Sequence, residues 1–131
     1  MKLNKTVTQW IRYARTDLKV AKFSLEASAD FKSAAAFHSQ QCAEKIIKAY
    51  LTHFKVRVQK THDIELLLTE VSKISPALAK SALKAKLLTT YAVTYRYPDA
   101  ERKPLTVAKA RAAIKIAEAT FEEFLDAIHK K

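Results

Sequence analysis

The side chains best suited to binding a ligand lie in an aromatic and basic segment late in the chain. Arg96 stands between Tyr95 and Tyr97, and Tyr91 precedes Tyr95 by one helical turn. A guanidinium group among aromatic rings can hold a phosphate by charge and hydrogen bonds while a ring stacks on a base. The alternative is an arginine that fixes its own loop through hydrogen bonds to carbonyl groups or to Asp99. The residues alone leave both interpretations open.

A second polar group interrupts an apolar stretch with helical periodicity. At helical spacing, His38, Gln41 and Lys45 share one face, whereas Gln40 and Glu44 lie on another. Hydrogen-bonding groups inside a helical bundle can bind a ligand or pair with a second subunit. The alternative is a solvated face together with a polar layer between helices.

The histidines and the cysteine form no recognisable metal or nucleophile motif. No two of the four histidines stand at the i, i+4 spacing of a helical zinc site; they are His38, His53, His62 and His129. The single Cys42 lies mid-helix among alanines, a setting typical of a small buried thiol. We therefore expect no metal and no cofactor.

The composition limits the class of protein. A chain of 131 residues is the size of one domain. It contains no glycine, which excludes the P-loop and the Rossmann turn and disfavours tight β-hairpins. No apolar run approaches the ~20 residues of a membrane span, and no signal peptide follows Met1. We expect a soluble, cytoplasmic protein that does not associate with membranes.

The net charge indicates the kind of partner. The 24 lysines and arginines against 13 aspartates and glutamates give a formal charge of +11. Such an excess favours anionic partners: nucleic acid, nucleotides or an acidic protein surface. The alternative is a solvated lysine surface with no ligand.

Hydrophobic periodicity predicts five helices, at about residues 3–27, 31–54, 61–73, 76–90 and 106–128. Ser75 followed by Pro76 is typical of a helix start, because serine caps the helix and proline suits its first position. Pro98 and Pro104 predict a loop over residues 94–105, since proline disfavours helix in the residue before it. Long helices with short connections predict an all-α protein, an up-and-down antiparallel bundle formed by the single domain 1–131.

Four segments in order resemble the HEPN domain family, over about residues 10–125. They are Trp10…Ala14…Asp17-Leu18…Ala21, then Phe37-His38-Ser39-Gln40-Gln41-Cys42-Ala43-Glu44-Lys45 with Lys48-Ala49, then Lys60-Thr61-His62-Asp63-Ile64 with Leu67-Leu68, and Tyr95-Arg96-Tyr97-Pro98-Asp99-Ala100. The resemblance implies an up-and-down helical bundle, commonly a homodimer. It also implies a partner, because small HEPN proteins are often encoded beside a minimal nucleotidyltransferase, sometimes as toxin and antitoxin.

The favoured function is therefore nucleotide or RNA binding. Arg96 would hold a phosphate, and Tyr95 or Tyr97 would stack on a base or shape the pocket. The full set of expected binding residues is Arg96, Tyr95, Tyr97, His38, Gln41, Lys45, His62 and Asp63. For His62 the alternative is a residue at the helix entry that bonds only to the backbone.

Two other functions remain in view. Several HEPN lineages are metal-independent ribonucleases with an R-x(4–6)-H motif; Arg96 fits its arginine, but Glu101, Arg102 and Lys103 occupy the three positions open to histidine. With that motif incomplete, an endoribonuclease would need Arg96 together with Glu101 or His62. The third interpretation is a structural protein whose basic stripe meets an acidic partner; the stripe consists of Arg12, Arg15, Lys19 and Lys22.

Overall fold

The computed structural model describes residues 2–92 and 101–130, and this part of the chain is helical with no strand. Its α-helices are α1 (Lys5–Ala27), α2 (Lys32–His53), α3 (Ile64–Ser72), α4 (Pro76–Ser81) and α5 (Val107–His129). Two 3₁₀ helices, η1 (Ala29–Phe31) and η2 (Leu83–Ala92), complete it. The predicted all-α fold is confirmed. No helix in the described ranges is long and apolar enough to cross a membrane.

Side-chain caps set the start of most of these helices. A side-chain oxygen of the capping residue accepts a hydrogen bond from a free backbone N–H in the first turn. The caps are Asn4 of α1, Asp63 of α3, Ser75 of α4 and Thr106 of α5. Pro76 also occupies the first turn of α4, as expected from the sequence.

The predicted helix over residues 76–90 is only partly correct. It is α-helical to Ser81 and continues as the 3₁₀ helix η2 from Leu83. Ala82, Ala85 and Leu88 are buried at intervals of three residues, the repeat that places side chains on one face of a 3₁₀ helix. Leu83 and Leu87 do not share this face, and both are exposed.

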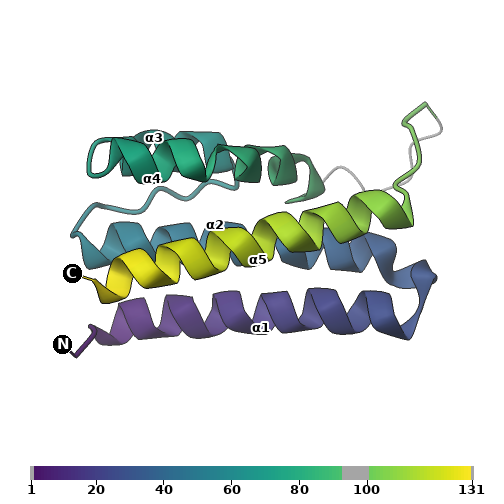
Figure 1. Ribbon diagram of the computed structural model, residues 1–131, viewed down its shortest axis with the longest axis horizontal. Coiled ribbons are helices and arrows are strands. Elements are labelled where there is room, and N and C mark those ends of the chain that lie inside the picture. The colour runs from purple at the N-terminus through teal and green to yellow at the C-terminus, as the bar shows by residue number, and fades with distance from the viewer. Residues whose placement is uncertain (1, 93–100, 131) are drawn as a thin grey trace.

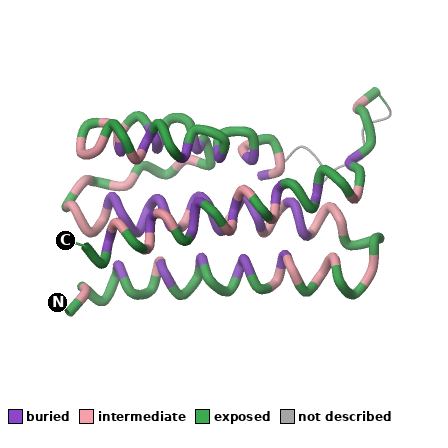
Figure 2. The backbone as a smooth tube through the Cα atoms, in the orientation of Figure 1, coloured by how far each residue is buried: buried purple, intermediate pink, exposed green. Residues whose placement is uncertain are grey.

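Helix α2 lies at the centre of the bundle. It packs against α1, α3, η2 and α5, and 13 of its residues are buried, compared with six in α1 and seven in α5. α1 runs in the direction opposite to α2 and α5, while α3, α4 and η2 cover another side of α2 (Figure 1). The tube view shows the buried positions concentrated on the inner sides of the helices (Figure 2). Polar residues in the middle of α2 therefore have little access to water.

Candidate functional site

The polar residues of α2 lie inside the bundle. Gln40, Glu44 and Lys48 are buried, and they recur every four residues along one side of the helix. Burying polar groups is costly unless they are hydrogen-bonded. Within the described part of the chain, every buried side-chain nitrogen and oxygen atom has such a partner. The position of these residues is thus compatible with a stable fold.

Glu44 is the centre of this arrangement, which we call the Glu44 cluster: Gln40, Glu44, Lys48 and His62. The ammonium group of Lys48 donates a hydrogen bond to Oε2 of Glu44 at 2.6 Å. The amide Nε2 of Gln40 donates to Oε1 at 2.8 Å, and Nδ1 of His62 lies 2.9 Å from the same oxygen. Nε2 of Gln40 also reaches the backbone carbonyl of His62 at 3.3 Å, which ties the start of α3 to α2.

The cluster keeps Glu44 ionised. Burial acts to raise the pKa of this carboxyl group, but hydrogen bonds from Lys48, Gln40 and His62 oppose it, as does the charge of Lys48. Together they lower the pKa of Glu44 below its ordinary value. An ionised carboxylate only accepts hydrogen bonds, so Nδ1 of His62 must be the donor in their contact.

This geometry gives His62 an oriented imidazole ring. The side chain of Glu44 is 4% exposed, whereas that of His62 is 65% exposed. Nδ1 is engaged by Glu44, and Nε2 has no partner within residues 2–92 and 101–130. A carboxylate that holds one ring nitrogen fixes the tautomer and leaves the other nitrogen able to accept a proton or a hydrogen bond. The expected alternative for His62, a contact with backbone alone, does not describe this arrangement.

A second carboxylate lies beside the first cluster. In the Asp17 cluster, which consists of Asp17, His38 and Lys45, Nδ1 of His38 lies 2.8 Å from Oδ1 of Asp17. Nζ of Lys45 donates to Oδ2 of Asp17, also at 2.8 Å. Nε2 of Gln41 donates to Oε1 of Gln40 in the Glu44 cluster at 2.6 Å. Two polar clusters therefore lie along α2: the Asp17 cluster reaches α1, and the Glu44 cluster reaches the entry of α3.

Two aromatic rings of α1 lie beside these clusters, one at each. The ammonium group of Lys48 lies 5.7 Å from the ring centroid of Trp10, and that of Lys45 lies 5.9 Å from the ring centroid of Tyr13. Both distances are within the range of cation–π attraction. Tyr13 is exposed. Exposed aromatic rings beside lysines are the surface on which unpaired bases stack.

The expected binding residues fall into three groups. His38 and Lys45 belong to the Asp17 cluster, His62 belongs to the Glu44 cluster, and Gln41 donates to Gln40 of the latter. Asp63 instead caps α3, accepting a hydrogen bond from the backbone N–H of Leu66 at 3.3 Å. Arg96, Tyr95 and Tyr97 lie outside the described residues. Glu101 is exposed in the turn that precedes α5.

The helix η2, which precedes Arg96 in the chain, is hydrogen-bonded to a residue near His62. The backbone N–H of Ile64, two residues after His62, donates to the hydroxyl group of Thr89 at 3.1 Å. Thr89 lies near the end of η2, three residues before Ala92. The end of η2 therefore lies beside the entry of α3.

The sequence did not identify Asp17 as the partner of His38 and Lys45. Asp17 lies on the buried side of α1 with Ala14, Leu18 and Ala21, where its charge breaks the apolar pattern. A charged residue on an apolar helix face suggests a buried partner, but the pattern does not say which one. The pairing with His38, 21 residues later, becomes visible only in the folded chain.

The remaining candidate chemistry is limited. Within the described ranges, no group of three or more histidine, cysteine, aspartate or glutamate residues is placed to hold a metal ion. Cys42 is buried in the core, and this burial raises the pKa of its thiol far above the ordinary value. A thiol that stays protonated is a poor nucleophile. Its expected role as a small buried thiol is confirmed.

Comparison with known proteins identifies the family of this chain. The family model of the HEPN domain matches residues 7–128, so the chain belongs to the HEPN family. A crystal structure of ST0689, an archaeal HEPN homologue, is 28% identical, with a TM-score of 0.72 over 98% of this chain and 99% of that one. The crystal structure of TT1696 from Thermus thermophilus is 26% identical, with a TM-score of 0.76 over 94% of this chain and 98% of that one. No curated protein matches the sequence.

Proposed function

We propose that this HEPN protein binds a nucleotide or RNA in the cytoplasm, at the exposed edge of the Glu44 cluster. The observation that carries the proposal is the His62 ring, which the buried Glu44 orients while Nε2 remains without a partner in the described ranges. A pre-oriented imidazole can donate to a phosphate when protonated or hydrogen-bond to a base. Arg96 would supply the phosphate contact, with Tyr95 or Tyr97 stacking on a base.

The charge of the chain supports an anionic ligand. The formal charge is +11, and the ion pairs between lysines and carboxylates in the described ranges engage only a few of the cations: Lys22, Lys45, Lys48, Lys73 and Lys86. Exposed lysines outside these pairs, such as Lys5, Lys60 and Lys109, can attract phosphates. Such attraction weakens as the salt concentration rises.

A gel-shift experiment tests this proposal. We expect His62→Ala and Arg96→Ala each to weaken binding of a structured, end-labelled RNA by about tenfold or more, because each removes a hydrogen bond to a charged group. His129→Ala is the matched control, since His129 is an exposed histidine at the far end of α5. Equal affinity of all three variants and the wild type would rule out the proposed site.

The Glu44–His62 pair also favours a second candidate function, a metal-independent endoribonuclease. A carboxylate-oriented imidazole can act as a general base, and Arg96 would stabilise charge on the phosphate. The same end-labelled RNA, incubated with the protein and a metal chelator, shows cleavage on a gel as shorter labelled fragments. His62→Ala should then reduce the rate ~10²–10⁴-fold, while loss of cleavage in Glu101→Ala alone would assign the role to Glu101. Binding of RNA without cleavage would dismiss this second candidate.

We further propose that the protein forms a homodimer and pairs with a nucleotidyltransferase in the manner of a toxin and its antitoxin, as the family resemblance implies. Support comes from the exposed rings of Phe23 and Phe31 near the turn between α1 and α2. Exposed aromatic side chains of this kind favour contact with another protein surface.

A further inference from the structure

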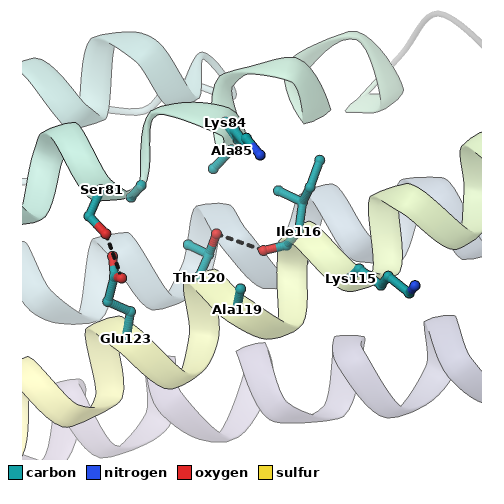
Figure 3. A pocket seen from close by; sticks show the side chains of 9 residues that line it. Ser81, Lys84, Ala85, Lys115, Ile116, Ala119, Thr120 and Glu123 are labelled. Atoms are coloured by element: carbon teal, nitrogen blue, oxygen red, sulfur yellow. Dashed lines mark hydrogen bonds between the residues drawn. The ribbon is translucent and has the colours of Figure 1, made fainter.

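A groove lies between the α4–η2 segment and α5, and none of its lining residues belongs to the Glu44 or the Asp17 cluster. Its volume is about 240 Å³. The floor consists of small or apolar side chains from both elements: Ala82, Ala85, Ile116 and Ala119 (Figure 3). Lys115 and Glu123 on α5 bound it, so the groove extends for about 12 Å along that helix. A floor of small side chains allows the backbone of another helix to approach closely.

The groove carries an asymmetric distribution of charge. Lys84 and Lys115 line it, and neither has an ion-pair partner in the described part of the chain. At the other end, the hydroxyl group of Ser81 donates to Oε2 of Glu123, the one carboxylate that lines the groove, at 2.7 Å (Figure 3). With two ammonium groups against one carboxylate, the lining has a net positive charge, concentrated at the end away from Glu123.

Two exposed leucines of η2 lie outside the lining of the groove. Leu83 is 44% exposed and Leu87 is 60% exposed, and both belong to η2. Leu83 also lines a second hollow of about 320 Å³, which lies between α3 and α4. The features that favour a ligand of the groove are therefore its own floor and its lysines.

We propose that this groove docks an acidic amphipathic helix of a partner protein. The apolar face of that helix would pack on the alanines and Ile116, and its carboxylates would lie against Lys84 and Lys115. A small anionic ligand would contact the lysines and leave the alanines and Ile116 uncovered, whereas a helix of a few turns spans the whole groove. RNA would gain little from this apolar floor, because its outer surface is charged. This inference is independent of the nucleic-acid site and does not require it.

Fluorescence anisotropy with a labelled helical peptide of about 15 residues tests the proposal. The probe has leucines at i, i+3, i+4 and i+7 with glutamates elsewhere, and a scrambled peptide has the same composition. Binding of the probe to the wild type should weaken about tenfold in Ala119→Gln, which fills the groove at an exposed position. The double charge reversal Lys84→Glu with Lys115→Glu should weaken it by about tenfold or more.

Matched controls separate docking from general attraction to a basic protein. Ala112→Gln changes another exposed alanine of α5, and the pair Lys103→Glu with Lys109→Glu reverses the same amount of charge; all three positions lie outside the groove. These variants should bind the probe within about twofold of the wild type. Absence of binding, equal binding of the scrambled peptide, equal weakening in the controls, or displacement of the peptide by one equivalent of RNA would each overturn the proposal.

Discussion

At the scale of single residues, the carboxylate of Glu44 is the acceptor that pairs the buried donors of α2. Its two carboxylate oxygens accept hydrogen bonds from three side chains on α2 and at the entry of α3. Lys48 has no other ion partner in the described ranges, and its side chain is nearly as buried as that of Glu44. Removing the carboxylate would therefore leave a buried ammonium group without compensation, which is more costly than losing an exposed ion pair.

We predict that Glu44→Gln lowers the free energy of unfolding at pH 7 by about 3 kcal/mol. The pKa of Glu44 is lowered in the folded state, so its stabilising contribution is complete above the ordinary value of 4.5 and is lost as the pH falls through the folded-state pKa. Urea unfolding of the wild type should thus show a steeper loss of stability below pH 4.5 than Glu44→Gln shows.

Glu70→Gln provides the control for this prediction. Glu70 pairs with the exposed Lys73 at 2.8 Å, and such surface pairs contribute at most about 1 kcal/mol. Its unfolding should follow the acid dependence of the wild type closely. Parallel curves for the wild type and Glu44→Gln would mean that Glu44 is not the carboxylate whose pairing responds to acid.

At the scale of the elements, the end of α2 shows how a chain without glycine stops a long helix. Lys55 has φ of 63°, the only non-glycine residue with positive φ in the described ranges. The backbone N–H of Val56 donates to Leu51 at 2.9 Å, and that of Lys55 donates to Thr52 at 3.0 Å. This pair of bonds is the Schellman motif, in which glycine usually occupies the left-handed position. Lysine is strained there, since its Cβ approaches the backbone.

We predict that Lys55→Gly stabilises the protein by about 0.5–1 kcal/mol and raises Tm by about 2–4 °C, because relief of strain exceeds the added freedom of the unfolded chain. Arg57→Gly is the control: Arg57 lies two residues further on, at negative φ, and the change should destabilise by about 0.4–1 kcal/mol. Calorimetry measures both. A lower Tm for Lys55→Gly would contradict this account of the turn.

At the scale of the whole molecule, α2 is the surface on which the other helices pack. Ile47 is completely buried at its centre, and Phe121 of α5 is also buried. α1, α5 and the α3–η2 segment meet α2 from different sides, so a cavity left there has several walls and collapses incompletely. Because the same helices exclude water from the buried side of α2, the polar side chains there need hydrogen-bond partners within the protein.

We predict that Ile47→Ala and Phe121→Ala each cost about 2–5 kcal/mol of unfolding free energy. Leu87→Ala removes a side chain of similar size from the exposed surface of η2 and should cost well under about 1 kcal/mol. Chemical denaturation of the three variants provides the comparison. Equal losses would mean that burial does not distinguish these positions.

The sequence by itself determined the parts of the protein that depend on neighbours a few residues apart. Helical periodicity predicted α1, α2 and α5 within a few residues, and Ser75 with Pro76 placed the start of α4. The absence of glycine and the ordered motifs also indicated an all-α HEPN protein, which the family match confirms. These features are local because each follows from the geometry of one helix.

Only the tertiary structure decided which polar groups meet. Asp17 reaches His38 across 21 residues and Glu44 reaches His62 across 18, distances at which helical spacing carries no information. The burial of Glu44 and Lys48 also depends on the helices that surround α2, as does the 3₁₀ winding of η2. Packing selects the pairs between elements, because a buried charge is stable only where the fold gives it a partner.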